Sequence, residues 1–279
     1  MDPPLRSNGS NNRPSVQAPT RAVARSRVAG RVDRVLNTAL GGERAAVLNV
    51  TAAELLADSV PVARTLESAL GKPGVGLLGH LMVHDLIRRS NLYDELVNAL
   101  ASPNPLTRVS AARICAAARI PDSVVWLGDL LQDPTPRLRE AGVRSLAQLG
   151  GRRAVELLMG ASDRIPQYRL AIALARAASD VDIEALMRRP ETESAAVATV
   201  LACGLRRDVL RVPPLLGIAH DRRWPKQVRK AACKSLAMIG DRSAADGLKR
   251  LALYEPDPDV KSAADRAHNR LVKKVVAPR

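Results

Sequence analysis

Apolar and polar residues recur with a period of about thirty residues along the C-terminal two thirds of the chain. The segment 102–113 aligns with 133–144 without gaps at an offset of 31 residues, which places Arg108 on Arg139. Successive spacings of 30, 29, 31 and 32 residues lead from Arg139 to Arg169, Ala198, Arg229 and Lys261. Because self-similarity at such a period is the signature of a repeat architecture, we expect six repeat units over residues 92–274.

Each unit has the same internal plan: a short apolar helix, a turn rich in Pro and Asp, and a longer helix of small residues. Proline stands at the start of the longer helix, as at Pro105 and Pro136, where its missing N–H costs no intrahelical hydrogen bond. Small residues such as Ala141, Gly142 and Ser145 follow the repeated Arg, and they let neighbouring helices approach closely. The pattern predicts an all-α fold, an α-solenoid of stacked antiparallel helix pairs.

The N-terminal third of the chain has a less regular pattern. Residues 31–91 contain a capping box at Thr51 and Glu54, and we expect them to form an N-terminal helical cap or degenerate repeats. Residues 1–30 are predicted to be a disordered basic tail, with a transit peptide as the alternative because such segments are also rich in Arg and poor in acids. Residues 275–279 are predicted to be a flexible C-terminus.

Composition fits this architecture. The 279-residue chain has five aromatic residues and no Phe, so Ala, Leu, Val and Ile must fill the core, which favours packed helices over sheets. The formal net charge of +15 permits an acidic partner without specifying one. Three well-separated cysteines predict buried, reduced thiols. With no apolar run near the roughly 18 residues of a membrane-spanning helix and no apolar signal core, we expect a soluble, cytoplasmic protein.

The order of motifs within a unit resembles that of the HEAT family, specifically the short HEAT-like repeats of bilin lyase subunits. One unit carries the pattern as Asp133-Pro134, Leu138-Arg139, Ala141 and Ser145-Leu146. A second carries it as Val228-Arg229, Ala231-Ala232 and Ser235-Leu236-Ala237. The fourth unit departs, because Ala198 replaces the Arg and no Asp-Pro precedes it. The resemblance covers about two thirds of the chain, and it implies a scaffold because HEAT solenoids serve mostly in that role.

No catalytic, cofactor or metal site is predicted. The fingerprint G-x-G-x-x-G at 74–79 follows a helical stretch rather than a strand, so a turn between helices explains it better than a dinucleotide site. His80 and His84 have the spacing of two metal ligands but lack a third. Deoxyhypusine hydroxylase is a HEAT-repeat enzyme whose iron site uses His-Glu pairs, and no histidine in this chain precedes Glu.

A second class of HEAT-like enzymes, the alkylpurine DNA glycosylases, uses a basic cleft with Trp side chains and a catalytic Asp. The chain is basic and has two tryptophans. Trp126 lies beside Val124 and Val125 and fits a core position better, whereas Trp224 lies in a turn. Glycosylase activity is therefore not the favoured interpretation.

The repeated basic residue of the longer helices is expected to be structural. A cation in the first turn of a helix opposes the helix dipole and therefore needs a partner. Asp133, Asp163 and Glu255 each precede a repeated basic residue by six positions, within plausible reach. The predicted structural ladder consists of Arg108, Arg139, Arg169, Arg229 and Lys261.

Positions one and five residues after the repeated basic residue are predicted to share one face of the longer helices, which line the concave side in HEAT solenoids. The successive pairs are Val109/Arg113, Glu140/Arg144, Leu170/Leu174, Thr199/Cys203, Lys230/Lys234 and Ser262/Arg266. Both ends are basic and the middle is apolar, so we expect a groove for an acidic amphipathic segment of a partner protein. The candidate partner-binding residues are Arg113, Arg144, Leu170, Leu174, Arg222, Arg223, Lys226, Lys230, Lys234 and Arg266.

Three other interpretations remain open at this stage. The face could be merely solvated, with Leu170 and Leu174 covered by a neighbouring helix. The solenoid could instead bind duplex nucleic acid, since the shortage of aromatics disfavours stacking of single strands. The phosphate-holding residues would then be Arg144, Lys226, Lys230, Lys234 and Arg266. An enzyme ranks third, because no nucleophile, base and orienting group recur together. A non-enzymatic scaffold or adaptor with a protein partner is the leading prediction.

Overall fold

The computed structural model describes residues 26–43, 45–188, 190 and 192–273. Regular secondary structure in these residues is entirely helical. The N-terminal helices are α1 (Arg27–Leu40), α2 (Ala52–Ala57), α3 (Ser59–Leu70) and α4 (Gly76–Arg89).

Six pairs of helices follow, each with a first and a second helix. The first helices are α5 (Tyr93–Asn98), α7 (Val124–Asp129), α9 (Arg152–Gly160), α11 (Asp180–Arg188), α13 (Val212–His220) and α15 (Ala245–Tyr254). The second helices are α6 (Pro105–Ala117), α8 (Pro136–Leu149), α10 (Gln167–Ala177), α12 (Glu193–Arg206), α14 (Lys226–Ile239) and α16 (Pro258–Lys273). Short 3-10 turns flank the first helices at η1 (Ala99–Ala101), η2 (Pro121–Ser123), η3 (Leu130–Gln132), η4 (Val209–Arg211) and η5 (Arg242–Ala244).

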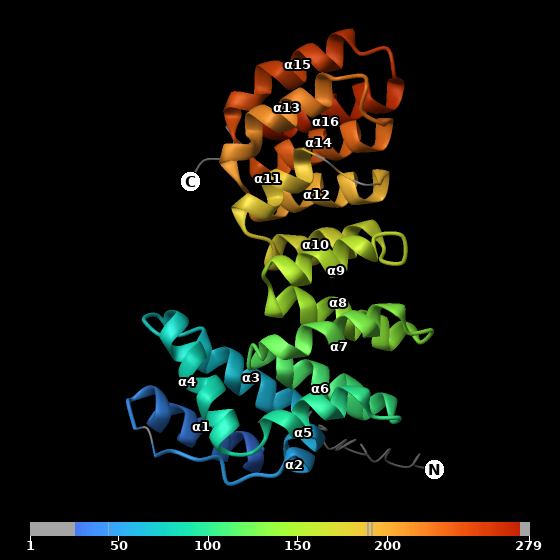
Figure 1. Cartoon of the computed structure of the whole chain (residues 1–279). Helices are drawn as coiled ribbons and strands as arrows, with labels where there is room; N and C mark the ends of the chain where they lie inside the picture. The colour runs from blue at the N-terminus through green and yellow to red at the C-terminus, as the bar shows by residue number, and fades with distance from the viewer. Residues whose placement is uncertain (1–25, 44, 189, 191, 274–279) are drawn as a thin grey trace, which may run out of the picture.

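The helix pairs stack along one direction, from the N-terminal helices to the C-terminal pair (Figure 1). Each second helix packs against the next, from α6 to α16 in order. At the N-terminal end α3 packs against α6, and α1 packs against α3, so these helices extend the same layer. The fold is therefore the predicted all-α solenoid.

Local sequence sets where the second helices begin and end. The Asn104 side chain accepts a hydrogen bond from the Leu106 N–H (2.9 Å) ahead of α6, and Pro105 occupies the first turn. The turns after α8 and α14 use Gly150 and Gly240, both with positive φ, a conformation that glycine adopts without steric cost. The helices are therefore delimited within each unit.

Small side chains form much of the core between second helices. Every residue of α12 from Ala195 to Gly204 is buried. A Cβ on Gly204 would lie 2.8 Å from the Cα of Ser235, so α12 and α14 approach each other as closely as glycine permits. This close contact explains how the fold does without Phe.

The boundary predicted for the N-terminal tail needs correction. Residues 27–30 belong to α1, where the Ser26 hydroxyl accepts a hydrogen bond from the Ala29 N–H (3.1 Å). Residues 1–25 of the predicted tail, and the predicted C-terminal segment 275–279, lie outside the described residues.

Candidate partner-binding face

Two hollows open on the face of the second helices. We call one the N-terminal hollow; it lies over α3, α6 and α8 and is lined by Val60, Ala63, Arg64, Glu67, Val109, Arg113, Arg137, Glu140, Ala141, Arg144, Ser145 and Gln148. The other, the C-terminal hollow, lies over α12, α14 and α16 and is lined by Gln167, Val197, Leu201, Gln227, Lys230, Ala231, Lys234, Ala237, Met238, Ala263, Arg266, Ala267 and Arg270. Each includes residues of the predicted paired positions: Val109, Arg113, Glu140 and Arg144 line the first, and Lys230, Lys234 and Arg266 line the second.

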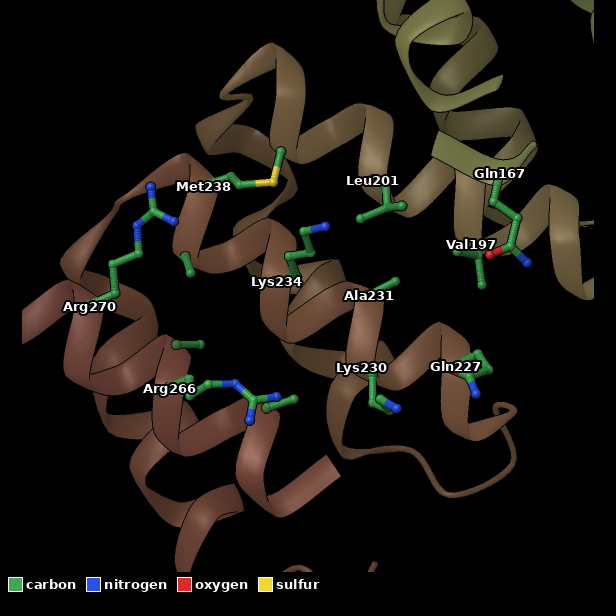
Figure 2. Close-up of a pocket in the computed structure, with 13 residues that line it drawn as sticks. Gln167, Val197, Leu201, Gln227, Lys230, Ala231, Lys234, Met238, Arg266 and Arg270 are labelled. Carbon is green, nitrogen blue, oxygen red and sulfur yellow. The ribbon is translucent and has the colours of Figure 1, made fainter. Parts of the chain in front are cut away.

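The C-terminal hollow combines cations with an apolar floor. Figure 2 shows Lys230 and Lys234 on α14, and Arg266 and Arg270 on the neighbouring α16. Its volume is about 550 Å³, and no Asp or Glu is among its lining residues. The floor comes from α12, α14 and α16 and includes Val197, Leu201, Ala231, Met238 and Ala263.

The contacts of the rim cations differ from one another. The Lys230 ammonium lies 3.7 Å from an oxygen of Asp259, which partly offsets its charge. The Lys234 ammonium lies 5.4 Å from the centre of the Tyr168 ring, a cation–π contact that leaves its charge without a carboxylate. Within the described part of the chain, no carboxylate comes within 4.0 Å of Arg266 or Arg270. The rim therefore keeps most of its positive charge.

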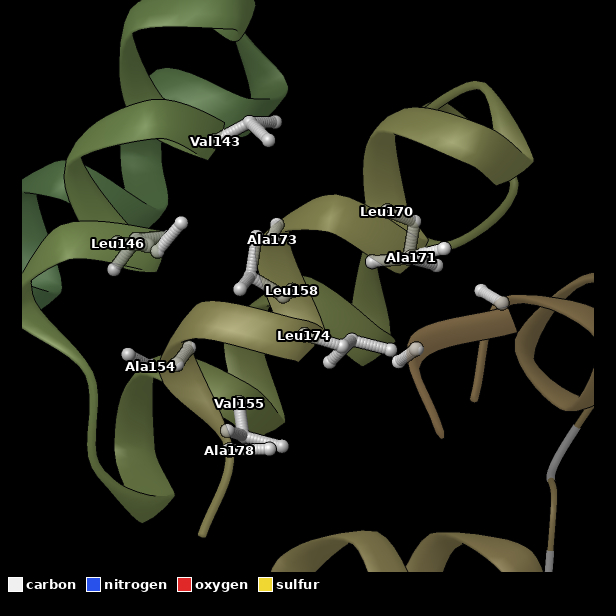
Figure 3. Close-up of a cluster of buried hydrophobic side chains, with 14 of the residues drawn as sticks. Val143, Leu146, Ala154, Val155, Leu158, Leu170, Ala171, Ala173, Leu174 and Ala178 are labelled. Atoms are coloured by element: carbon white, nitrogen blue, oxygen red, sulfur yellow. The ribbon is translucent and has the colours of Figure 1, made fainter. Parts of the chain in front are cut away.

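The predicted apolar centre of the groove is wrong in position. Leu170 and Leu174 are fully buried among side chains of α8, α9 and α10 (Figure 3), so they cannot contact a partner. On α10 the partly exposed residues one turn apart are Tyr168, Ile172 and Arg176. The predicted pair Leu170/Leu174 is thus two residues out of register, because Leu170 fills the buried position that Leu138 fills in the preceding unit, and Arg169 is therefore not equivalent to Arg139. The burial of these two leucines agrees with that part of the alternative interpretation.

The same register error affects the fourth unit. Thr199 and Cys203 are buried, whereas Val197 and Leu201 reach the floor of the C-terminal hollow. Helix α12 starts at Glu193 without an Asp-Pro turn, so the sequence offered no marker for its register. An apolar centre does exist, but it is supplied by α12 and not by α10.

Three other candidate cations lie away from the C-terminal hollow. Arg223 pairs with Asp221 of its own turn (2.9 Å), and Arg222 lines a separate hollow beside Tyr254. Lys226 lies 3.0 Å from Asp259, and this ion pair raises the pKa of Lys226. The charge of Lys226 is therefore largely offset by this carboxylate.

The N-terminal hollow has a different composition. Four arginines line it, together with Glu67 and Glu140, and its volume is about 520 Å³. Arg144 lies 3.0 Å from Glu140, and the Gln148 amide donates a hydrogen bond to Glu67 (2.9 Å). Where the C-terminal hollow has an apolar floor, the N-terminal hollow thus has charges of both signs and a hydrogen bond that joins α8 to α3.

Two of the repeated arginines join successive units, whereas in the described part of the chain Arg139, Arg169 and Lys261 form no ion pair with the carboxylates predicted for them. Arg108 pairs with Asp133 of the following unit (2.9 Å), and Arg229 pairs with Glu255 of the following unit through both carboxylate oxygens. Arg139 donates instead to the backbone carbonyls of Asp133 (2.9 Å) and Pro134 (2.8 Å). The turn acid therefore joins successive units rather than capping its own helix.

The remaining two ladder positions are less constrained. Arg169 lies 3.5 Å from Glu140 on the preceding second helix and is not paired with the predicted Asp163. Lys261 on α16 has no carboxylate within 4.0 Å in the described part of the chain, so the predicted pair with Glu255 does not form. The turn of the third unit is joined to the start of α12 by neutral groups, because Ser162 contacts the Thr192 hydroxyl (3.4 Å) and its carbonyl accepts a hydrogen bond from the Ser194 hydroxyl (3.3 Å).

Several residues that line the two hollows are not among the candidates predicted from the sequence. Arg270 lies one helical turn after Arg266 on α16, and this spacing of four residues could have indicated that the two arginines share a face. Met238 and Gln227 of the C-terminal hollow carried no such signal. Arg64 and Arg137 of the N-terminal hollow lie outside the paired positions, and only the contact of α3 with α6 and α8 brings them to this face.

Family membership follows from the repeat itself. The family model of HEAT repeats matches residues 93–179 and 180–268. The chain belongs to the HEAT-repeat family. The two matches meet between the third and fourth pairs of helices and together cover more than half of the sequence.

Solved HEAT-like structures resemble the chain only loosely. Human deoxyhypusine hydroxylase in complex with glycerol is 16% identical, with 88% of this chain and 97% of that chain covered and a TM-score of 0.35. The complex of CpcE and CpcF of phycocyanin lyase from a Nostoc species is 18% identical, with 75% and 94% covered and a TM-score of 0.33. An engineered protein is 19% identical, with 87% and 96% covered and a TM-score of 0.32. No curated protein matches the chain. Likenesses this loose carry no conclusion about activity or partners.

The histidine pair of this HEAT-repeat chain lies on α4, away from both hollows. Burial lowers the pKa of His80 and of His84, and the His84 ring makes an edge contact with Tyr93 at 5.1 Å between centres. Among the residues that the structure describes, no three His, Cys, Asp or Glu side chains group as metal ligands. The fingerprint at 74–79 spans the start of α4 and follows α3, so it lacks the strand that a dinucleotide site requires. No helix of the described chain is long and apolar enough to cross a membrane.

Proposed function

We propose that this HEAT-repeat protein is a non-enzymatic scaffold or adaptor that binds an acidic amphipathic segment of a partner protein in the C-terminal hollow. One observation supports it above all: an apolar floor is bordered by Lys230, Lys234, Arg266 and Arg270, with no carboxylate among the lining residues. The three buried thiols, whose pKa values burial raises to between about 11 and about 12, suit a reducing, cytoplasmic setting.

The shape of the floor favours a helical occupant. Val197 and Leu201 lie one turn apart on α12, and Met238 lies on the adjacent α14. An amphipathic helix presents apolar side chains at matching intervals of three and four residues. Carboxylates along the flanks of such a helix would meet the rim cations, which would fix its orientation and speed its association.

Duplex nucleic acid is a weaker candidate for this face. Of the five residues expected to hold phosphates, Arg144, Lys226 and Lys230 each lie within 4.0 Å of a carboxylate. The apolar floor would also contribute nothing to the binding of a phosphate backbone. We therefore keep nucleic acid as an outcome of the test.

The test uses a synthetic amphipathic peptide with Leu at helical spacing on one face and Glu on the flanks, labelled for fluorescence anisotropy. A scrambled peptide of equal composition separates docking from charge attraction. We expect the amphipathic peptide to bind more tightly than the scrambled one, with a modest salt dependence. Equal binding of both peptides would contradict the proposal, as would a steep log-linear salt dependence together with tighter binding of a DNA duplex.

Charge reversal locates the site on the protein. The double change Lys234→Glu and Arg270→Glu should weaken binding of the amphipathic peptide roughly tenfold or more, because two attractive rim contacts become repulsive. The matched control is Arg242→Glu with Lys249→Glu, which alters net charge equally at exposed residues outside both hollows. The change Met238→Glu places a carboxylate in the apolar floor and should therefore also weaken binding of the amphipathic peptide. Equal losses in rim and control variants would reject the C-terminal hollow.

A further inference from the structure

The N-terminal hollow brings together more positive charge than its carboxylates neutralise. Arg64 comes from α3, Arg113 from α6, and Arg137 and Arg144 from α8. Glu140 is shared between Arg144 (3.0 Å) and Arg169 (3.5 Å). Glu67 accepts from the Gln148 amide. In the described part of the chain, Arg64, Arg113 and Arg137 have no carboxylate within 4.0 Å.

Arg113 is held in this hollow by a neutral partner. Its Nη1 donates to the hydroxyl of Ser59 (2.9 Å), which in turn donates to the hydroxyl of Ser110 (3.1 Å). Burial lowers the pKa of Arg113, and the nearby charges of Arg144 and Arg137 lower it further. A half-buried guanidinium that faces two other guanidiniums is electrostatically unfavourable unless an anion joins it.

One part of the wall of this hollow is apolar. Val60 and Ala63 on α3 face Val109 on α6 and Ala141 on α8 around the same space of about 520 Å³. Val60 is 43% exposed, so an organic group of a ligand could cover it. The site therefore offers forked donors for an oxyanion beside an apolar wall for the group that carries it.

From this arrangement we infer that the N-terminal hollow binds a phosphomonoester, with the phosphate held by Arg64, Arg113 and Arg137 and the organic group against Val60 and Val109. The planar guanidinium presents donors that match phosphate oxygens, and a dianion offsets two of the three uncompensated charges. This site is separate from the C-terminal hollow, so it adds a second ligand to the proposed scaffold and does not depend on it.

The experiment measures binding of phenyl phosphate and of inorganic phosphate to the full chain by isothermal titration calorimetry, at constant ionic strength set by chloride. We expect saturable binding of both, with phenyl phosphate tighter because its ring covers the apolar wall. Arg113→Gln and Arg137→Gln should each weaken phenyl phosphate binding roughly tenfold, as expected for the loss of one charge-assisted contact. Arg137 is exposed and lacks an ion-pair partner, so this variant should fold normally even if Arg113→Gln does not.

The control variant Arg242→Gln removes an exposed arginine far along the chain and should leave binding unchanged. Circular dichroism of each variant without phosphate monitors the fold. The inference is overturned by an absence of saturable binding, or by equal losses in Arg137→Gln and Arg242→Gln. Tighter binding of inorganic phosphate than of phenyl phosphate would also overturn it, because the apolar wall would then have no role.

Discussion

The two hollows occupy the same face of the same solenoid, yet they differ in the residues that accompany their cations. In the C-terminal hollow, Val197, Leu201 and Met238 line the same space as Lys234 and Arg270, and the floor is apolar. In the N-terminal hollow, Glu67, Glu140 and Gln148 stand among the arginines and bond to one another or to the cations. Basic positions recur at both ends of the face, and the residues that accompany them differ, which is why we propose a different ligand for each end.

The same contrast appears in the ion pairs that join successive units beneath this face. Arg229 and Glu255 are both buried, and Arg229 also donates to the Ala219 carbonyl (3.0 Å). Arg108 and Asp133 occupy the equivalent positions nearer the N-terminus, but both side chains are partly exposed. The pair at the C-terminal end is thus fully desolvated, and the pair at the N-terminal end keeps some contact with solvent.

The largest expected effect comes from breaking the buried pair. Arg229→Ala leaves the Glu255 carboxylate buried without its partner, and it should lower the free energy of unfolding of the C-terminal units by about 3–5 kcal/mol. Arg108→Ala removes the more exposed equivalent and should cost less, about 1 kcal/mol. Urea denaturation followed by circular dichroism measures both. Equal losses in the two variants would contradict the distinction between the two ends.

Thiol labelling shows whether the damage stays local. Cys233 on α14 and Cys115 on α6 are buried, and burial raises both thiol pKa values to about 12, so each reacts only when its region opens. Because a repeat contacts only its neighbours, Arg229→Ala should speed labelling of Cys233 by about two to three orders of magnitude and leave Cys115 nearly unchanged. Single-cysteine variants separate the two rates. Acceleration at both thiols would show that the solenoid opens as one unit.

The sequence could predict the architecture because most units carry their own markers. Proline at the helix start, small residues after the repeated Arg, and the period itself identify six pairs and the face that they share. The sequence could not predict that Leu170 is buried or that Val197 lines the C-terminal hollow. The third unit lacks the Asp-Pro turn, and the fourth lacks both that turn and the repeated Arg. Nor could the sequence predict that Asp133 and Glu255 bind the Arg of the preceding unit, since that contact depends on how units stack. Arg64 joins its hollow only through the packing of α3 on α6.

An intermediate effect is expected where second helices touch most closely. Gly204→Ala would place a Cβ 2.8 Å from the Cα of Ser235, forcing α12 and α14 apart at a cost of about 1–3 kcal/mol. Because these two helices form the floor of the C-terminal hollow, binding of the amphipathic peptide should also weaken. Thermal unfolding and anisotropy measure the two effects.

Two other glycines sharpen this prediction. Gly142→Ala would clash with Leu130 and the Leu127 carbonyl inside one helix pair, so it should lower stability without altering peptide binding at the other end. Gly217→Ala meets no atom within 4 Å and should be neutral or stabilising by a few tenths of a kcal/mol to about 1 kcal/mol. If Gly142→Ala weakened peptide binding as much as Gly204→Ala, the floor of the C-terminal hollow would not be set by the spacing of α12 and α14.

The smallest effect separates the two ion pairs by their pH dependence. The Arg229 hydrogen bond is the main cause that lowers the pKa of Glu255, whereas the main cause for Asp133 is the Thr135 backbone N–H, with Arg108 second. A carboxyl group whose pKa is lower in the folded state stabilises the fold above its unfolded pKa, and this stabilisation is lost as pH falls through the folded value. Arg229→Gln should therefore reduce the dependence of the unfolding free energy on pH below 4.5, the ordinary pKa of Glu255. Arg108→Gln should leave most of the pH dependence that Asp133 contributes, because the Thr135 N–H still lowers the pKa of Asp133. Unfolding free energies measured from neutral to acidic pH test this difference. An equal reduction of the pH dependence in both variants would mean that the arginine, and not the backbone N–H of the turn, is the main group that lowers the pKa of both acids.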